Sequence, residues 1–494
     1  MNMQNTMIQF LTKRHLAALA ACFAAVSCSV ADMDVSMSFD REDSAYAPEG
    51  TGDKFDEYEE NSFIKTEDSN VSTFSIDADG ASYAYMRKML SLGRRPAAGA
   101  VRIEEYLNYF TFNYPEPGKD HTVALNGEVG ECPWNREHML MRLGLKGKSP
   151  GAERPLSNYV FLIDVSGSMN SDDKIGLLKR GLAELVDQLE PEDRISIITY
   201  SGSVKRLLES TRAAESDIIK SAISKLVASG STAGGEAMEM AYKEALDNYI
   251  EGGNNRVIMG TDGDFNVGVT STDALLEMVE GYAAKGIYLT VCGFGTGNLN
   301  DSMMETISNK GNGTYVYIDS EDEMTKVFVN EVSSFYSVAN DVKVQVTFDK
   351  DAVESYRLIG YENRLMADSD FEDDGKDAGE IGAGQTVTAL YEIIPGKKYS
   401  EASKVAGFEV RYKKALGEES AELGMDVVDS GKVSDEFSFA AGVAAYGMLL
   451  KDSKYKGAST YDMAWSLVGA GLHYDKWGYR AQLRDLIQKA GKID

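Results

Sequence analysis

The residues whose types and spacing could do chemistry lie at the end of an apolar run, in FLIDVSGSMN. Asp164 closes that run, and Ser166 and Ser168 follow it at alternating positions. A buried core penalises three such polar groups unless they have polar partners. Thr232 in SGSTAGGE and Asp262 in RVIMGTD are the other candidates. Together these residues supply carboxylates and hydroxyls, hard oxygen donors that suit Mg²⁺ or Mn²⁺, whereas zinc prefers His and Cys.

These side chains can act together only if the fold brings them to one place. From residue 158 to about residue 338, apolar strands alternate with amphipathic helices. Strands are expected in NYVFLID, RISIITY, RVIMGTD, IYLTVCGFG and GTYVYID, and helices at 174–189, 216–227, 236–250, 272–286 and 321–337. This alternation predicts a mostly parallel sheet with helices on both faces. Ligands of such sheets bind at the carboxyl ends of the strands, where Asp164 and Asp262 are expected.

An alternative interpretation is that Asp164 and the serines form only the N-terminal cap of a helix that starts near Asp172. Capping would explain Ser168 or Ser171. It would not explain why Thr232 and Asp262 are expected at the same edge of the sheet, so the metal-site interpretation accounts for more of the pattern.

DVSGS, with Thr232 and with Asp262 in TDG, resembles the metal-ion-dependent adhesion site of von Willebrand factor type A domains. All five positions agree with the family pattern. The resemblance implies an α/β fold of the von Willebrand factor A type, which is Rossmann-like. It also implies that Ser166, Ser168 and Thr232 touch a Mg²⁺ ion (or Mn²⁺ or Ca²⁺), while Asp164 and Asp262 act directly or through water. A carboxylate from a partner protein would complete the coordination.

The flanks resemble a bacterial lipoprotein subfamily with a central type A domain. STFSIDADGASYAYMRKML and ECPWN resemble its N-terminal segment, and YRLIGYENRLM resembles its C-terminal domain. The expected organisation is a signal peptide at 1–27, an acidic flexible tether at 28–70, an α+β flanking segment at 71–155, the type A domain at 156–338, and a C-terminal domain of strands and then helices at 339–494. We expect the segments 71–155 and 340–435 to fold together as a smaller β-rich platform.

The N-terminus has the charge order of a secretory signal, because Lys13, Arg14 and His15 precede a short apolar run that ends at a cysteine. That arrangement resembles bacterial lipoprotein signals and predicts a lipid on Cys28. The frame LAAC makes Cys22 an alternative, and an ordinary cleaved signal without lipid is another. The resulting expectation is an exported, lipid-anchored protein of the bacterial cell envelope, on the periplasmic or the surface face of the outer membrane.

Composition and the remaining motifs exclude several classes of function. The net charge of −28 argues against a nucleic-acid partner, which would need phosphate neutralisation. His121, His138 and His473 fit no catalytic spacing, and no general base stands near the site apart from the ligands themselves. We therefore expect a binding protein and no enzyme, with an envelope assembly or maturation factor as the alternative and a metal-dependent hydrolase as a weaker one.

Two further patterns resemble functional sites and are interpreted as structural. DFEDDGK (370–376) has the first acidic positions of an EF-hand loop, but it lacks the required glutamate at position 381 and predicts a solvated acidic turn. Cys132 and Cys292 lie far apart in the sequence and predict two buried thiols, not one disulfide bridge.

Overall fold

The structure is a computed structural model that describes residues 52–493 except 152–153, 231–234 and 264–270. The predicted signal peptide, Cys22 and Cys28 lie outside the described residues. Within the described residues, no helix is both long enough and apolar enough to cross a membrane. Cys132 and Cys292 are free and buried, which confirms that prediction.

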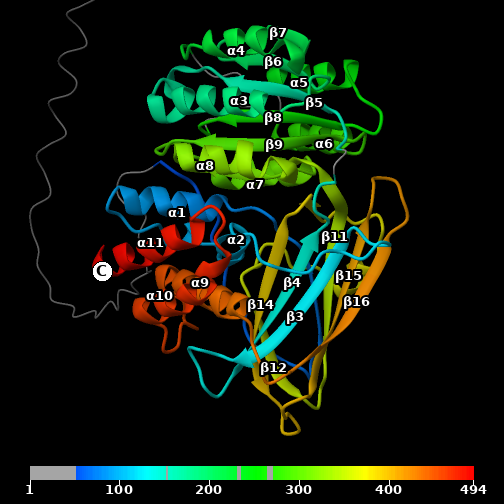
Figure 1. Ribbon diagram of the computed structural model, residues 1–494, viewed down its shortest axis with the longest axis vertical. Coiled ribbons are helices and arrows are strands. Elements are labelled where there is room, and N and C mark those ends of the chain that lie inside the picture. The colour runs from blue at the N-terminus through cyan, green and yellow to red at the C-terminus, as the bar shows by residue number, and fades with distance from the viewer. Residues whose placement is uncertain (1–51, 152–153, 231–234, 264–270, 494) are drawn as a thin grey trace, which may run out of the picture. The chain divides into compact units, whose positions relative to one another are not determined.

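A six-stranded sheet forms the type A domain, with the strand order β10-β9-β8-β5-β6-β7 (Figure 1). Its strands are β5 (Ser157–Asp164), β6 (Arg194–Tyr200), β7 (Val204–Arg212), β8 (Asn254–Thr261), β9 (Ile287–Phe294) and β10 (Tyr315–Ile318). All are parallel to their neighbours except β7, which pairs antiparallel with β6. The predicted, mostly parallel sheet is confirmed. The edge strand β7 was not predicted, because its half-exposed, charged sequence lacks the apolar run of a buried strand.

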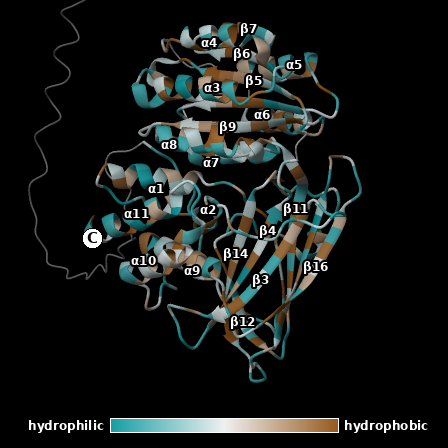
Figure 2. Ribbon diagram, viewed as in Figure 1, coloured by the Kyte–Doolittle hydropathy of each residue, from teal (hydrophilic) through white to brown (hydrophobic). Residues whose placement is uncertain are grey.

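Helices cover both faces of this sheet, as predicted. The helices α3 (Leu177–Asp187), α4 (Ser216–Ser224) and α8 (Glu321–Thr325) pack on one face, and α5 (Gly235–Asp247), α6 (Thr272–Ala283) and α7 (Asp301–Lys310) pack on the other. The strands β5 and β8 are buried along their whole length. In Figure 2 the strands of this sheet show brown segments, while the helices around it carry teal faces. This burial on both faces explains why the strands are continuous apolar runs.

The prediction of one continuous helix at 321–337, the last of the domain, is wrong in its second half. After α8 the chain forms a π-helical turn at Lys326–Asn330 and a 3-10 turn at Val332–Phe335. A strand, β11 (Ser337–Phe348), begins directly afterwards.

The predicted pairing of the two flanking segments is confirmed. Two sheets, ordered β1-β12-β14-β4-β3 and β13-β11-β15-β16, enclose a shared apolar core. Their further strands are β1 (Ile64–Lys65), β2 (Val71–Ser75), β3 (Val123–Glu131), β4 (Met139–Gly147), β12 (Val353–Ile359), β13 (Gly379–Gly382), β14 (Thr386–Pro395), β15 (Lys404–Lys413) and β16 (Ala421–Val428). N-terminal β4 pairs with C-terminal β14, and N-terminal β2 pairs with β11. We call this two-sheet unit the platform.

Composition alone placed residues 52–70 in the acidic tether, but they are part of the folded chain. The strand β1 pairs with β12, and the Thr66 hydroxyl donates a hydrogen bond of 2.6 Å to the Val353 carbonyl. Short contacts between distant segments, which leave no periodic pattern in the sequence, hold this stretch in place.

Helices from both ends of the chain complete the structure. The C-terminal helices α9 (Asp435–Lys451), α10 (Tyr461–Ala470) and α11 (Tyr479–Ile493) share an apolar core with α2 (Ile103–Asn108). The helix α1 (Ala81–Ser91) lies between two cores. Its residues Tyr83, Met86 and Leu90 belong to this helical core, and Ala84, Tyr85 and Met89 belong to the core of the type A domain. The type A sheet therefore borrows one covering helix from the N-terminal flank.

Buried ion pairs also join the type A domain to the N-terminal flank. Arg102 Nη1 lies 2.7 Å from Asp301 Oδ2, at the start of α7. Arg87 Nη2, from α1, lies 2.6 Å from Glu323 Oε2 of α8. Because the charged groups of these pairs are buried, the two parts of the chain are held by interactions that cannot be exchanged for water without cost.

Glu104 in α2 is a buried carboxylate, 1% exposed. Among the described residues no cation contacts it, and neither of its carboxylate oxygens has a hydrogen-bond partner. Burial, helped by the negative charges of Glu362 and Asp77, raises the pKa of Glu104 to about 7. The folded protein therefore holds this proton more tightly than the unfolded chain does. Its contribution to stability is fully present below about pH 4.5 and is lost as the pH rises through 7.

We expect Glu104→Gln to remove this loss. From pH 5 to pH 8, wild type should lose on the order of 3 kcal/mol in free energy of unfolding that the variant does not lose. Urea denaturation of both proteins at the two pH values measures the difference. An equal difference at both pH values would contradict the assignment.

Candidate metal centre

The strand order places the candidate site at a crevice between β5 and β8. The chain leaves β5 through β6 and β7 and then returns to β8 on the other side of β5. The carboxyl ends of two such strands diverge into a ligand-binding crevice. Asp164 ends β5, and Asp262 directly follows Thr261, the last residue of β8. Both predicted carboxylates are thus at this crevice.

Asp164 is a fully buried carboxylate. Its exposed fraction is 0%, and its Oδ1 accepts a 2.8 Å hydrogen bond from the backbone N–H of Ser166. Its Oδ2 accepts a long hydrogen bond, 3.4 Å, from the Thr261 hydroxyl. Burial raises the pKa of Asp164 to about 6, against the lowering effect of the Ser166 hydrogen bonds, and the charge of Asp262 adds to the rise. Among the described residues no lysine or arginine forms an ion pair with Asp164, so the negative charge of this carboxylate has no cationic partner there.

The two serines lie side by side at the mouth of the crevice. The Oγ atoms of Ser166 and Ser168 are 3.0 Å apart. Adjacent ligands of an octahedral Mg²⁺ ion, each about 2.1 Å from the metal, are separated by about 3 Å. The same 3.0 Å is the length of a hydrogen bond between the two hydroxyls, so the fit to the ion rests on donor chemistry. Hydroxyl and carboxylate oxygens suit a hard divalent ion such as Mg²⁺ or Mn²⁺.

Lys174 is the main feature of this crevice that the sequence did not predict. Its Nζ lies 2.9 Å from Asp262 Oδ2 and 3.5 Å from Asn298 Oδ1. Burial acts to raise the pKa of Asp262, but hydrogen bonds from Lys174, Asn298 and Ser168 hold it below its ordinary value. One oxygen of Asp262 thus already pairs with an ammonium group. This favours an Asp262 that would contact a metal ion through a bridging water and not directly. The one feature of the sequence that could have pointed to Lys174 is its position: it opens the helix expected directly after Ser166 and Ser168.

Thr232 lies outside the described residues, but the chain just before it is hydrogen-bonded to the loop that carries Ser166 and Ser168. The backbone N–H of Gly167 donates a 3.0 Å hydrogen bond to the carbonyl of Gly230, and the N–H of Ser229 donates one of 2.7 Å to Val165. Gly230 has φ +91°, a conformation that favours glycine. The structure therefore brings Asp164, Ser166, Ser168 and Asp262 together, while Thr232 stays a prediction.

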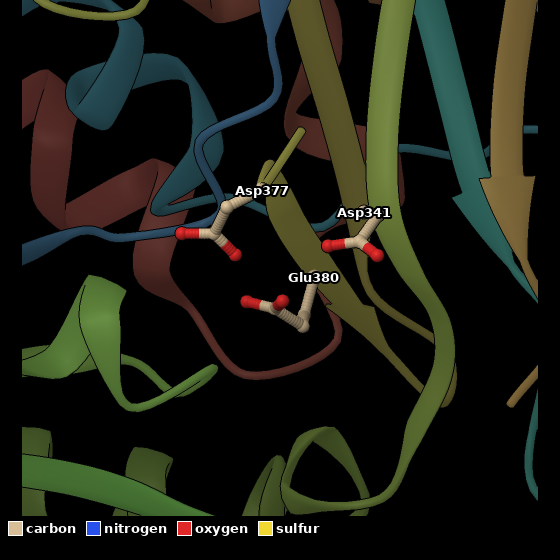
Figure 3. A group of neighbouring side chains, drawn as sticks. All are labelled: Asp341, Asp377 and Glu380. Atoms are coloured by element: carbon tan, nitrogen blue, oxygen red, sulfur yellow. The ribbon is translucent and has the colours of Figure 1, made fainter. Parts of the chain in front are cut away.

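A second group of acidic side chains lies on the platform: Asp341 on β11, Asp377, and Glu380 on β13 (Figure 3). Two of these carboxylates already have ammonium partners. Lys413 Nζ is 2.7 Å from Asp341 Oδ2, and Lys310 Nζ is 3.6 Å from Asp377 Oδ2. We assign no metal to this group.

The DFEDDGK turn is no calcium loop either. Its backbone carbonyls accept hydrogen bonds from lysines, as in the 2.7 Å bond from Lys413 Nζ to the carbonyl of Asp374. Residues 372–376 are exposed, which confirms the predicted solvated turn.

Comparisons with known proteins agree with this architecture. Family models match residues 49–142 (von Willebrand factor), 158–330 (von Willebrand factor type A domain) and 333–493 (uncharacterized protein YfbK, C-terminal). The uncharacterized protein YfbK of Escherichia coli is 35% identical over 467 residues, which cover 89% of this chain and 81% of that protein. Human inter-alpha-trypsin inhibitor heavy chain H4 is 30% identical over 240 residues, 44% of this chain and 25% of that protein.

Among solved structures, a von Willebrand factor type A protein from Catenulispora acidiphila is 16% identical, with a TM-score of 0.43, over 75% of this chain and 91% of that one. The relationship rests on the sequence matches, which span nearly the whole described chain. The chain belongs to the family of von Willebrand factor type A domain proteins that includes YfbK of Escherichia coli.

Proposed function

We propose that this protein is a divalent-cation-dependent protein-binding module. Ser166, Ser168 and Thr232 would hold Mg²⁺ (or Mn²⁺ or Ca²⁺), with Asp164 and Asp262 acting directly or through water. The observation that carries the proposal is Asp164, a fully buried carboxylate with no ion-pair partner among the described residues, beside two hydroxyl oxygens 3.0 Å apart. A buried charge of this kind needs a compensating cation.

The chemistry of the donors indicates what would complete the site. When neutral hydroxyls and water are the direct ligands, a divalent ion keeps most of its charge and attracts a further negative ligand. An aspartate or glutamate of a partner protein is such a ligand. Two of its relatives are the uncharacterized protein YfbK and an inter-alpha-trypsin inhibitor heavy chain. The proposed setting is the bacterial cell envelope, with a lipid on Cys28 (or Cys22) as the membrane anchor.

Water-proton relaxation with Mn²⁺ tests the proposal directly. Mn²⁺ bound to the protein should enhance the relaxation of bulk water, because one coordination position stays open to exchanging water. Acetate, a minimal carboxylate, should reduce that enhancement, whereas acetamide at the same concentration should not. Failure of the folded protein to bind Mn²⁺ would overturn the proposal, and equal effects of acetate and acetamide would overturn the carboxylate specificity.

A further inference from the structure

The segment Gly52–Phe55 lies along the loop that joins β9 to α7 at the crevice. Gly52 N donates to the carbonyl of Gly297 at 3.1 Å, and Lys54 N donates to that of Leu299 at 2.8 Å. Lys54 also pairs with Asn300 as an isolated parallel bridge. We call Gly52–Phe55 the strap and Gly295–Asn300 the edge loop. The two segments are far apart in the chain: 244 positions separate Asp53 from Gly297.

Asp53 is the centre of this contact. Its Oδ1 accepts hydrogen bonds from the backbone N–H groups of Gly297, at 2.7 Å, and Leu299, at 2.9 Å. Its Oδ2 accepts a third, at 3.0 Å, from the Tyr85 hydroxyl of α1. A carboxylate that accepts three hydrogen bonds fixes its donors more firmly than a neutral acceptor would. Asp53 therefore links the edge loop to α1 through three hydrogen bonds.

The backbone of the strap also approaches the edge loop closely. A Cβ atom at Gly52 would lie 2.5 Å from the carbonyl oxygen of Gly297, which no ordinary contact allows. The ring of Phe55 packs against that of Tyr85, with centroids 4.7 Å apart. Glycine at this position and the aromatic contact next to it fix where the strap lies.

The edge loop in turn contacts the candidate metal centre at two points. Asn298 Oδ1 lies 3.5 Å from Lys174 Nζ, the ammonium group that pairs with Asp262. The backbone directly after Asp262 packs against the same loop, since a Cβ atom at Gly263 would lie 2.6 Å from Asn300 N. Any shift of the edge loop would therefore move groups on both sides of the Asp262 carboxylate.

We propose that the strap positions the metal centre, and that Asp53 is a positioning residue for cation binding through the edge loop. The inference rests on the proposed function, because it concerns the same site. It follows that displacement of the strap from the edge loop would weaken cation binding. Asp53 itself does not touch the ion.

Titration calorimetry with Mg²⁺ tests this inference. We expect Asp53→Ala to weaken Mg²⁺ binding by about 3- to 10-fold. Asp56→Ala is the matched control, because it removes an equal charge three residues further along, where the Asp56 side chain accepts a hydrogen bond from the Tyr58 hydroxyl and from no other described residue. That control should leave the affinity unchanged, which separates positioning from long-range attraction of the cation. Asp53→Asn, which keeps one acceptor oxygen, should fall between the two.

Amide hydrogen exchange provides a second readout that needs no metal. In metal-free protein, the amides of Gly297 and Leu299 should exchange faster in Asp53→Ala than in wild type. Tyr85→Phe removes only one partner of Asp53 and should give a smaller effect of the same sign, which keeps the test open if Asp53→Ala folds poorly.

The outcomes separate the two proposals. If wild type, Asp53→Ala and Asp56→Ala all bind Mg²⁺ with the same affinity, the positioning role is overturned and the proposed function still stands. Faster exchange at the edge loop with unchanged Mg²⁺ affinity would show that the strap is only structural, and would overturn the inference too. No Mg²⁺ binding by wild type would overturn both.

Discussion

Asp164→Asn should abolish the stabilisation of the folded protein by Mg²⁺ and leave the metal-free protein at least as stable as wild type. With Mg²⁺ at about 100 times its dissociation constant, wild type should gain about 2.7 kcal/mol in free energy of unfolding. The variant should gain nothing measurable, because the amide removes the negative charge that attracts the ion. Urea denaturation in chelator and in Mg²⁺ measures both quantities.

The second half of this prediction follows from burial. Asp164 is 0% exposed and has no ion-pair partner among the described residues, so the metal-free protein bears the cost of an uncompensated carboxylate. Asparagine keeps an oxygen to accept the hydrogen bond from Ser166 N, which is 2.8 Å long in wild type. We therefore expect the metal-free variant to be about 1 kcal/mol more stable than wild type.

Asp193→Asn is the matched control for this prediction. Asp193 is equally buried, but its Oδ2 forms an ion pair with Arg154 and its Oδ1 accepts a 2.7 Å hydrogen bond from Ser157 N. This substitution should lower stability and preserve the response to Mg²⁺. A Mg²⁺ response that survives in Asp164→Asn would contradict the assignment of the site.

The sequence was sufficient to predict where Asp164 and Asp262 lie, because each follows an apolar strand and strand ends of a parallel sheet meet at one edge. The same argument could not find Lys174 or Asn298. Lys174 opens a predicted helix and Asn298 lies in a loop, and their side chains meet only through the packing of that helix start against the loop. Asp53 was harder still. It stands in an acidic stretch whose composition predicts a tether, and its two partners in the edge loop are 244 and 246 residues away.

The elements of the fold divide in the same way. Long, buried strands such as β5 and β6 were predicted nearly to the residue, because burial forces a continuous apolar run. The strands β13 and β16 and the helix α7 were not predicted. β13 has only four residues and β16 alternates between half-buried and exposed positions. The role of α1 in the core of the type A domain depends on a contact between distant parts of the chain, which periodicity does not report.

The largest loss of stability is expected from Arg102→Met, because Arg102 is a buried cation shared by several carboxylates. It is 4% exposed, and Glu105, Asp301 and Glu305 all form ion pairs with it. Removal of the guanidinium leaves Glu105 and Asp301 buried without this partner, while Glu305 keeps a longer contact of 3.6 Å to Arg364. The expected cost is about 3–5 kcal/mol in free energy of unfolding, measured by guanidinium denaturation.

Two comparisons make this prediction specific to buried charge. Arg180→Met removes an exposed cation, 40% exposed at its side chain, that pairs with Asp172 and Glu321, and it should cost less than about 1 kcal/mol. Adding Asp301→Asn to Arg102→Met should recover part of the loss, because it removes one of the carboxylates left without a partner. Equal losses for Arg102→Met and Arg180→Met would show that the joint between the type A domain and the N-terminal flank depends on apolar packing and not on these ion pairs.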